Sequence, residues 1–498
     1  MTPHVRVAMI GSGFGGLGMA IGMRRRGIRD FVVFERADDV GGTWRDNTYP
    51  GCQCDVPSHL YSFSFAPNPD WSRTYSTQPE IQEYLRRCAR RFGVLPHIRF
   101  GHEVLEAAWD DATRRWRIET SGGTWTADVL ISANGALAEP ATPPIPGLER
   151  FEGTRFHSAA WNHDTDLAGR RVAMVGTGAS AVQIVPKIQP HVRSLHVFQR
   201  TPAWVLPHTD RPVTAFERKL YRRVPEAQML ARGLIYLSRE MLVPGFAKDP
   251  RLVAPIRALA TSHLRRQVRD PELRRKLTPR FSPGCKRLLL SNDFYPALTA
   301  SNVELVTDPI RELDEGAVVT ADGARHEVDT VVFGTGFRVT DNPVMERLRG
   351  RDGRRLAETW RDAGLRAYLG TTVPGFPNFF LMSGPNTGIG HTSLLVMIEA
   401  QMRYVLGCLD LMRREDIGTV EVRAEACDRF NAWLDARLRR TVWNSGGCVS
   451  WYLDRHGRNG TMWPDFTWRF RSLTRRFDPG AYRLERTAAG REPEPVPA

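Results

Sequence analysis

Two charged residues of opposite sign stand at the same distance from two glycine-rich turns. Glu35 follows Gly11 by 24 positions (35 − 11), and Arg200 follows Gly176 by 24 positions (200 − 176). A carboxylate at such a position accepts hydrogen bonds from ribose hydroxyls and repels a phosphate, whereas a guanidinium pairs with a phosphate through two parallel hydrogen bonds. The spacing therefore predicts two nucleotide sites, of which the second favours a 2′-phosphate.

The first turn has the sequence context that dinucleotide binding requires. An apolar run at 5–10 leads into G-x-G-x-x-G, a helical stretch, and a second apolar run at 31–34 that ends in Glu35. Gly11, Gly13 and Gly16 permit a tight turn and a close backbone approach, and the start of the helix faces a pyrophosphate. We expect this unit to hold the adenosine half of FAD.

The same arrangement recurs from residue 171. A strand at 171–175 leads into a G-x-G-x-x-A turn, and a strand at 195–198 ends beside Arg200. The turn residues expected to contact the cofactor are Gly176, Gly178, Ser180 and Ala181. Because only NADP carries a 2′-phosphate, this unit is expected to bind NADPH. The alternative for Arg200 is a solvent-facing arginine in an arginine-rich chain.

These turns predict an α/β chain with two Rossmann-like dinucleotide-binding domains. We expect 1–140 and 326–486 to form the FAD domain and 141–325 to form the NADPH domain, with a return strand and glycine turn at 328–336. Residues 213–276 lack the alternation of strands, which predicts a helical insertion in the NADPH domain. The segment 487–498, rich in Pro, Glu and Ala, is predicted to be disordered.

The composition argues against several partners. The chain of 498 residues carries a formal charge of +14, but five of its 69 basic residues are lysine, and acidic residues interrupt its densest basic stretch at 218–280. We expect no nucleic-acid partner, while a basic surface that attracts anionic cofactors or membrane headgroups stays open. No apolar run reaches about 18 residues, which argues against an integral membrane protein. The chain enters a strand at once, without a leader, so a cytoplasmic location is expected.

The cysteines and histidines form no motif of metal or redox chemistry. The seven cysteines are scattered and odd in number, which predicts reduced, mostly packed thiols. The sequence contains no H-E-x-x-H and no C-x-x-C pair. We therefore predict no metal site.

Two longer motifs carry a family resemblance. They are Phe151-x-Gly153-x3-His157-x3-Trp161 and Gly41-Gly42-x-Trp44-x4-Tyr49-Pro50-Gly51-x3-Asp55. With the two glycine turns and the Gly384-Pro385-Asn386 segment, they resemble the type I Baeyer–Villiger monooxygenases, within the flavin-containing monooxygenases of class B. The chain departs from the family pattern at Asn162, where Pro or Asp is usual. Residues 283–287 and 450–452 are similar to those of hydroxyacetophenone-type members.

The resemblance implies an FAD monooxygenase that uses NADPH and O2. Through a C4a-peroxyflavin it would insert one oxygen atom next to the carbonyl of a small-molecule ketone, giving an ester or lactone. The resemblance places the catalytic cation at Arg287, with Asp55 as its orienting carboxylate, and Lys286 beside Arg200 at the 2′-phosphate. A fixed cation in a dry site stabilises the anionic oxygen species, and a buried arginine requires a carboxylate partner. The alternative for Lys286 and Arg287 is an exposed basic dipeptide.

The resemblance also assigns two further groups of residues. The cofactor contacts are Gly42, Thr43, Trp44 and Asn386, and the linker fingerprint is Phe151, Gly153, His157 and Trp161. In the family, His157 belongs to a linker that couples cofactor movement to the domains and transfers no proton. Its alternative is a histidine hydrogen-bonded within the linker, and Trp161 is equally explained as a packing residue.

Three other functions stay open from the sequence. A flavin monooxygenase that oxygenates nitrogen or sulfur needs no cation at Arg287. A simple NADPH–flavin reductase usually carries the C-x-x-C that is absent here. A basic membrane-surface or nucleic-acid module is the third alternative, motivated by the insertion. The sequence predicts neither the identity of the substrate nor the oligomeric state.

Overall fold

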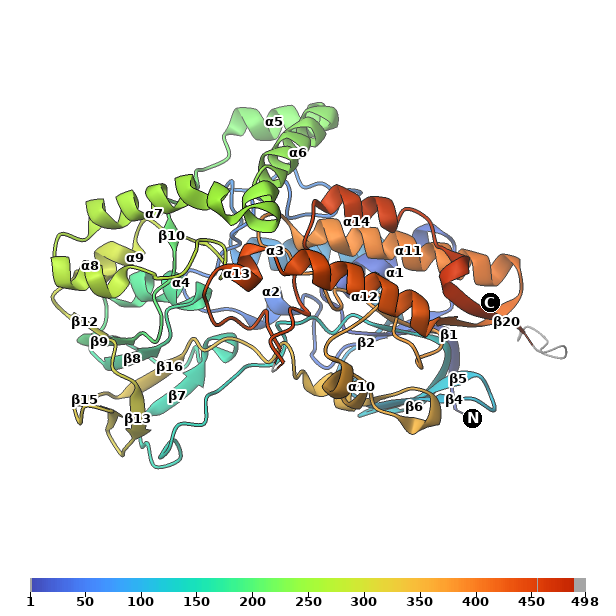
Figure 1. Cartoon of the computed structure of the whole chain (residues 1–498), viewed down its shortest axis with the longest axis horizontal. Helices are drawn as coiled ribbons and strands as arrows, with labels where there is room; N and C mark the ends of the chain where they lie inside the picture. The colour runs from blue at the N-terminus through green and yellow to red at the C-terminus, as the bar shows by residue number, and fades with distance from the viewer. Residues whose placement is uncertain (1, 455, 488–498) are drawn as a thin grey trace.

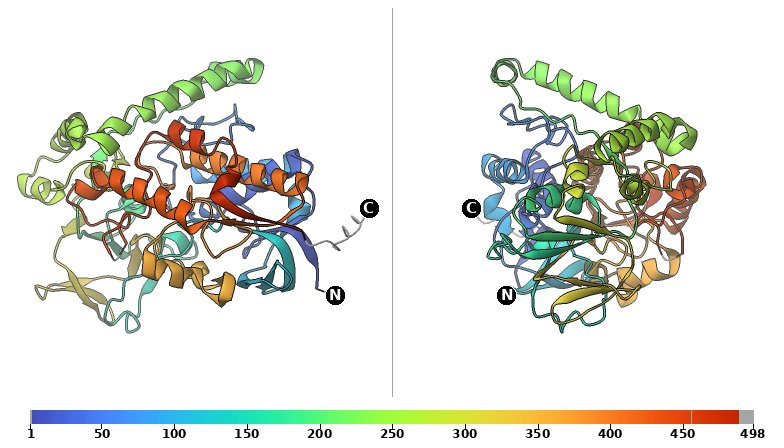
Figure 2. Two further views of the ribbon diagram at one scale, coloured as in Figure 1. Left: turned by 45° about the vertical axis from the view of Figure 1, so that its right-hand side comes forward. Right: turned by 90° about the vertical axis from the view of Figure 1, so that its left-hand side faces the viewer.

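The computed structural model describes residues 2–454 and 456–487. Two mainly parallel sheets, each covered by helices, lie side by side, and a group of helices projects from one edge of the molecule (Figures 1 and 2). The predicted α/β class with two Rossmann-like units is confirmed. No helix in the described part of the chain is long and apolar enough to cross a membrane.

The first sheet is built around a parallel core. The strands of this core are β1 (His4–Ile10), β2 (Phe31–Phe34), β3 (Ile98–Arg99), β6 (Gly123–Ser132) and β18 (Phe379–Leu381), all parallel to one another. The antiparallel strands β4 (Val104–Asp110) and β5 (Arg115–Thr120) extend it from the first half of β6, and β17 (Leu348–Arg349) joins the edge. Strand β2 is buried throughout, because helices and the β4–β5 extension leave neither face open to water.

Close helix packing covers one face of this sheet. Helix α1 (Phe14–Arg25) contacts α3 (Gln78–Arg91) and α11 (Leu394–Arg414). A Cβ atom on Gly18 would lie 2.9 Å from Met402 Sδ, and one on Gly22 would lie 2.8 Å from Leu406 Cδ1. The two glycines therefore let α11 approach α1 and hold the first glycine turn against the sheet.

The second sheet is fully parallel, in the order β12-β9-β8-β16-β7. These strands are β7 (Thr154–His157), β8 (Arg171–Val175), β9 (Ser194–Phe198), β12 (Val303–Val306) and β16 (Thr330–Phe333). Helices α4 (Ala179–Ile188) and α9 (Phe294–Leu298) pack together beside it, and an antiparallel sheet of β13 (Ile310–Leu313), β14 (Ala317–Thr320) and β15 (Arg325–Glu327) adjoins it.

Strand β16 corrects the expected end of the second unit. We expected the strand at 328–336 to return the chain to the first domain, but β16 pairs with β8 on one side and β7 on the other. The second sheet therefore includes residues up to Phe333, beyond the expected limit at 325. The apolar run of β16 would suit a buried strand of either sheet, so the hydrophobic pattern does not show to which sheet the strand belongs. Only its pairing with β7 and β8 does.

The two connections between the sheets lie against each other. Pro140 and Phe337 form an antiparallel bridge, and the backbone N–H of Ala141 donates to the carbonyl of Gly336 at 2.9 Å. The outgoing and returning segments thus form one hydrogen-bonded double crossing.

The segment 213–276 contains four α-helices. They are α5 (Ala215–Arg223), α6 (Pro225–Glu240), α7 (Ala254–Gln267) and α8 (Pro271–Leu277). Helices α5, α6 and α7 run along the upper edge of the molecule in Figure 1, and α8 lies below α7. Thr214 and Glu217 cap the start of α5 with reciprocal hydrogen bonds. The insertion leaves the second unit after β10 (Val205–Leu206) and returns at β11 (Leu289–Leu290), which pairs with β10.

The C-terminal part of the chain packs beside the first sheet. Its helices are α10 (Leu356–Ala363), α12 (Ala424–Leu438), α13 (Val442–Ser445) and α14 (Thr467–Leu473), and β19 (Ile417–Val422) pairs with β20 (Tyr482–Arg486). The tail predicted to be disordered, 487–498, lies outside the described residues except for Thr487.

The cysteines do not all remain free thiols. Cys285 and Cys448 form a disulfide with a Cα–Cα distance of 6.1 Å, which corrects the expectation of reduced thiols for this pair. The partners lie 163 positions apart, so their spacing along the chain gave no indication of the bond. The other five are buried free thiols: Cys52, Cys54, Cys88, Cys408 and Cys427.

Opening this disulfide should destabilise the chain, because the unfolded chain regains the entropy that a long closed loop removes. We expect Cys448→Ser to lower the free energy of unfolding by about 2–5 kcal/mol, measured by calorimetry without reductant. As the control, dithiothreitol should lower the melting temperature of the natural chain and leave that of the variant unchanged. Equal melting temperatures of the two proteins without reductant would contradict the pairing.

Candidate active site

A cavity of about 700 Å³ lies at the end of the first sheet where β1 runs into α1. Residues from both glycine units, from the insertion's return segment and from the C-terminal part line it. The predicted site residues among its lining are Gly11, Gly13, Glu35, Gly42, Thr43, Trp44, Asp55 and Arg287. Its volume is in the range of pockets that enclose a small-molecule ligand.

The first glycine turn leaves its helix start open toward the cavity. Gly11 has φ +92°, and a Cβ atom on it would lie 2.8 Å from the carbonyl oxygen of Ala133. A Cβ atom on Gly16 would lie 1.9 Å from the carbonyl oxygen of Gly11, so the third glycine of the motif is required by contact within the turn. Helix α1 has no side-chain cap at Gly13. Its first N–H groups are therefore available to a pyrophosphate, as FAD binding requires.

Glu35 lies at the end of β2 and lines the cavity. Its carboxylate accepts hydrogen bonds from the backbone N–H and hydroxyl of Ser12, at 2.9 and 2.7 Å, and forms an ion pair with Arg45 at 2.8 Å. These contacts hold the Glu35 carboxylate in place. They also occupy some of the positions at which its oxygens could accept hydrogen bonds from a ligand. Its contact with a ribose stays a prediction.

The segment after Glu35 forms a second glycine-assisted turn. Gly42 has φ +54° and precedes α2 (Thr43–Asp46), and a Cβ atom on it would lie 3.2 Å from Gly13 Cα. The two glycine turns therefore touch. Trp44 is buried, and its indole N–H donates to the hydroxyl of Tyr61 at 2.9 Å.

Asp55 and Arg287 form a bidentate ion pair on the cavity wall. Arg287 donates from Nε to Asp55 Oδ2 at 2.5 Å and from Nη2 to Oδ1 at 2.6 Å. A third, longer hydrogen bond of 3.4 Å runs from Nη1 to the carbonyl of Ile389. About a third of the Arg287 side chain (35%) and 28% of the Asp55 side chain face open space. The pair is thus surrounded by protein except toward the cavity.

The electrostatics keep both members of this pair charged. The charge of Asp55 raises the pKa of Arg287 further above its ordinary value, against the opposing effect of burial. Burial alone would raise the pKa of Asp55, but the charge of Arg287 and its hydrogen bonds lower it below the ordinary value of 3.8. Burial raises the pKa of the neighbouring Tyr452 to about 12, so its hydroxyl stays protonated. The cavity wall therefore carries a fixed cation at neutral pH.

The second glycine turn has the same geometry as the first. Gly176 has φ +106°, and a Cβ atom on it would lie 2.6 Å from the carbonyl oxygen of Gly334. Ala181 is buried against the sheet. Gly178, the residue directly before α4, faces open space, and no side chain caps the start of this helix. Open space in front of uncapped N–H groups fits a second pyrophosphate.

A hydrogen-bonded contact joins the two glycine units. The hydroxyl of Tyr49 donates to the side-chain carbonyl of Gln183 on α4 at 3.0 Å, and the Gln183 amide donates to the carbonyl of Gln53 at 2.9 Å. Ser180, at the start of the same helix, lies near the Tyr49 hydroxyl. Sequence reasoning missed Gln183, which carries no motif; its position on the helix one turn after Ser180 was the available indication.

Arg200 and Lys286 bring two positive charges together beside this turn. Arg200 is exposed at the end of β9, and Lys286 is partly buried. Burial lowers the pKa of Lys286, and the charge of Arg200 lowers it further. Two cations held close to each other favour an anion between them, as the 2′-phosphate of NADPH would be.

The linker fingerprint packs at the double crossing. His157 is buried at the end of β7, its Nδ1 accepts a hydrogen bond from the N–H of Ala159 at 3.0 Å, and its ring meets Phe337 edge-on. Burial lowers its pKa, so the ring is neutral at neutral pH. Phe151 belongs to the core of the second unit, and a Cβ atom on Gly153 would lie 2.4 Å from the carbonyl oxygen of Asp329.

Two other predicted residues have mainly structural contacts. Trp161 packs edge-on against Phe156, with ring centroids 5.0 Å apart. Asn386 is buried outside the cavity lining, and its amide donates to the carbonyls of Asn459 and Met462 at 2.8 and 3.1 Å. A cofactor contact of Asn386 stays a prediction.

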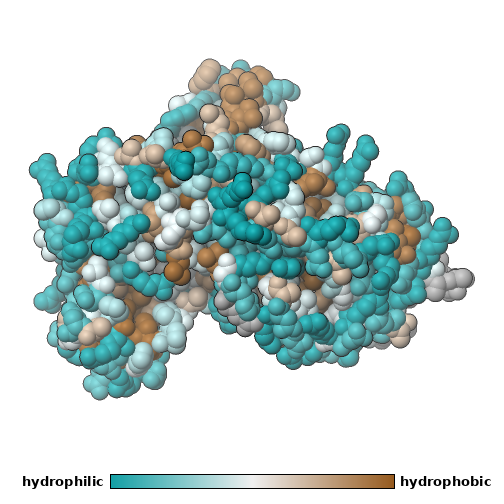
Figure 3. All heavy atoms as spheres, in the orientation of Figure 1, coloured by the Kyte–Doolittle hydropathy of each residue, from teal (hydrophilic) through white to brown (hydrophobic). Residues whose placement is uncertain are grey.

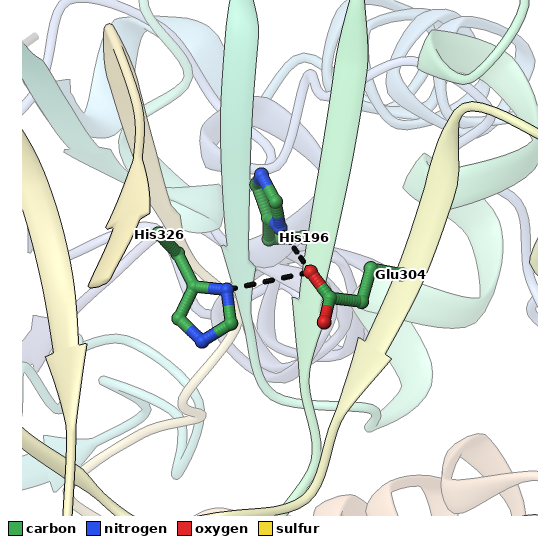
Figure 4. A group of neighbouring side chains, drawn as sticks. All are labelled: His196, Glu304 and His326. Atoms are coloured by element: carbon green, nitrogen blue, oxygen red, sulfur yellow. Dashed lines mark hydrogen bonds and ion pairs between the residues drawn. The ribbon is translucent and has the colours of Figure 1, made fainter. Parts of the chain in front are cut away.

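A separate polar cluster ties the second sheet to its neighbour. Glu304 on β12 lies beside His196 on β9 in register, and His326 approaches from β15 (Figure 4). One carboxylate oxygen lies 2.9 Å from Nδ1 of His196 and 3.4 Å from Nδ1 of His326. Two imidazoles and a carboxylate are donors that zinc accepts, and no motif predicted this group because it assembles from three strands. It lies outside the cavity lining, and we assign it the role of joining the two sheets.

Two dinucleotide-binding units that meet at one cavity define a two-nucleotide flavoenzyme. The comparisons agree with this class: the family model of flavin-binding monooxygenase-like proteins matches residues 4–236. A protein of Streptomyces coelicolor named Baeyer-Villiger monooxygenase is 53% identical over 97% of this chain and 93% of its own length. A Pseudomonas aeruginosa protein of the same name is 48% identical over 97% of this chain and 92% of its own length.

Solved structures extend the comparison to the whole fold. Cyclohexanone monooxygenase from Rhodococcus sp. Phi1, bound to NADP+, matches with a TM-score of 0.87 and 30% identity over 98% of this chain and all of its own. Steroid monooxygenase bound to NADP matches with a TM-score of 0.86 and 30% identity over the same shares. The chain belongs to the Baeyer–Villiger monooxygenases of the flavin-binding monooxygenase family.

Removal of either cation at the second glycine turn should weaken the binding of NADPH and leave that of NADH unchanged. We expect Arg200→Gln and Lys286→Gln each to raise the KM for NADPH about tenfold to a hundredfold, because each removes a charged hydrogen bond to the 2′-phosphate. The KM for NADH, which lacks that phosphate, should stay unchanged. Arg117→Gln, an exposed arginine on β5, serves as the control for the loss of one charge. Equal loss of both coenzymes would speak against the phosphate contact.

Proposed function

We propose that this chain uses FAD, NADPH and O2 to insert one oxygen atom next to the carbonyl of a small-molecule ketone, giving an ester or lactone. The relatives named Baeyer-Villiger monooxygenase and the similarity to cyclohexanone monooxygenase support this activity. The open start of α1 and the cavity beside it fit FAD, and the open start of α4 with Arg200 and Lys286 fits NADPH. Bound FAD, once reduced by NADPH, supplies the centre that reacts with O2 and donates oxygen.

The observation that carries the proposal is the Asp55–Arg287 pair on the cavity wall. During oxygen transfer to a ketone, negative charge develops on the carbonyl oxygen, and a fixed guanidinium stabilises it without first having to reorganise. Asp55 occupies Nε and Nη2 of Arg287. Nη1, with its single long contact to Ile389, is the part of the guanidinium with capacity for a substrate oxygen.

Asp55 acts as a positioning residue in this arrangement. Its two hydrogen bonds fix the plane of the guanidinium, and its charge compensates the cost of placing Arg287 among protein atoms. Because its pKa lies below the ordinary value of 3.8, Asp55 holds Arg287 throughout the neutral and mildly acidic range. Loss of the pair by protonation is therefore expected only below that value.

Arg287→Ala should separate NADPH oxidation from oxygen insertion. We expect the variant to consume NADPH while ester formation falls about a hundredfold or more, as loss of one group that stabilises a developing oxyanion does. The released hydrogen peroxide should account for the NADPH consumed. The measurement follows NADPH, peroxide and ester together across a panel of ketones, with Arg117→Gln as the control.

Two outcomes of that experiment distinguish the alternatives. Ester formation by Arg287→Ala at the natural rate would remove the role of this cation in attack on the carbonyl. If the variant still oxygenates a sulfide but no longer forms ester from a ketone, Arg287 is needed only for oxygen transfer to ketones. Asp55→Asn, which keeps the shape and removes the charge, should release peroxide at a level between those of the natural chain and Arg287→Ala.

A further inference from the structure

Helix α6 turns polar side chains toward the protein. Its buried residues are Gln228, Arg232 and Glu240. Gln228 donates to the carbonyl of Asn68 at 2.7 Å, and Arg232 donates to the carbonyl of His59 at 2.7 Å. A buried guanidinium needs such acceptors. These contacts fix which way the helix faces.

The opposite face of α6 is apolar and exposed. Four side chains along it are exposed by 65, 59, 60 and 79%: Leu230, Leu234, Leu237 and Met241. Their spacing places them on one stripe, and Phe216 on α5 is exposed by 74%. A helix packed on a protein normally buries its apolar face. Helix α6 packs Ile235 and Tyr236 against the core but leaves this second apolar face open to water. We call Leu230, Leu234 and Leu237 of α6, Met241 directly after it, and Phe216 of α5 the apolar stripe.

The apolar stripe lies where the chain projects. Helices α5 and α6 pack together and extend above the body of the molecule (Figures 1 and 2). Hydrophobic residues gather at this projection in the space-filling view (Figure 3). Contiguous exposed apolar surface of this kind marks an interaction site.

Positive charge is concentrated in the same insertion. Residues 213–276 contain 15 basic and 6 acidic side chains, a net charge of +9 out of +14 for the chain. On α5, Arg222 pairs with Asp70, whereas Lys219 and Arg223 are exposed and form no ion pair with the residues that the structure describes. The surface therefore combines apolar side chains with uncompensated cations.

We propose that the α5–α6 hairpin, residues 215–241, docks on an anionic lipid surface. The apolar stripe would enter the boundary between headgroups and acyl chains, and Lys219 and Arg223 would meet lipid phosphates. A second copy of the chain fits less well, because a symmetric contact would bring like charges together. A nucleic acid would satisfy the cations and leave the apolar stripe without a partner.

The hairpin is connected to the reaction site. Arg239, near the end of α6, donates to the hydroxyl of Tyr75 at 2.8 Å. Burial raises the pKa of Asp55 and Arg287 lowers it, and the charge of Arg239 adds a smaller lowering effect. Docking would bring the cavity near apolar ketones dissolved in the lipid. This consequence rests on the proposed oxygenation of ketones, whereas the docking itself does not.

The test measures binding of the FAD-loaded full chain to vesicles at low salt. We expect the chain to sediment with vesicles that contain phosphatidylglycerol and to stay in solution with phosphatidylcholine alone. The triple variant Leu230→Gln/Leu234→Gln/Leu237→Gln should bind at least about a hundredfold more weakly, because three leucines no longer enter the lipid. Lys219→Gln/Arg223→Gln should bind about tenfold to thirtyfold more weakly.

Matched variants and a second measurement keep the outcome clear. Leu105→Gln changes a leucine on β4 that is exposed by 49%, and Arg117→Gln changes an exposed cation on β5; both should bind like the natural chain. Flavin absorbance and ketone turnover without vesicles should be unchanged in every variant. Failure of the natural chain to bind phosphatidylglycerol vesicles would overturn the proposal. So would a natural dimer, measured by light scattering, that the triple variant converts to a monomer.

Discussion

The geometry of the site depends on one ion pair between residues 232 positions apart in the chain. Asp55 follows the first glycine unit, and Arg287 follows the helical insertion of the second. Neither charge is well placed alone, because each is surrounded by protein atoms that solvate it poorly. Each charge compensates the other only when the two nucleotide units meet at the same cavity, so the ion pair favours that arrangement. The Tyr49–Gln183 hydrogen bond supports the same arrangement next to the glycine turns.

Three consecutive residues of the return segment have separate partners. Cys285 is bonded to Cys448, Lys286 lies near Arg200, and Arg287 is bound to Asp55. Neighbouring α-carbons are about 3.8 Å apart. A displacement of the backbone at Lys286 is thus shared by Arg287, which ties recognition of the coenzyme to the position of the reaction-site cation.

The sequence predicted those features that depend on local backbone demands. Gly11, Gly16 and Gly176 are required by contacts within or next to their own turns. The spacing of these glycines in the sequence was therefore sufficient to predict the two nucleotide units. The Asp55–Arg287 pair came only through family resemblance, because no local pattern connects residues so far apart. The placement of β16 in the second sheet and the Cys285–Cys448 bond depend on tertiary pairing and were predicted wrongly. The exposed apolar face of α6 follows from buried acceptors at His59 and Asn68, which the helix's own sequence does not reveal.

The double crossing has a mechanical consequence. Since the outgoing and returning segments are bonded to each other at Pro140 and Phe337, the two sheets are joined at one pivot instead of by two independent tethers. Rotation about that pivot needs no stretching of either segment, and its effect grows with distance from the pivot. His157, buried and neutral at the end of β7, meets Phe337 edge-on, so β7 packs directly against this pivot.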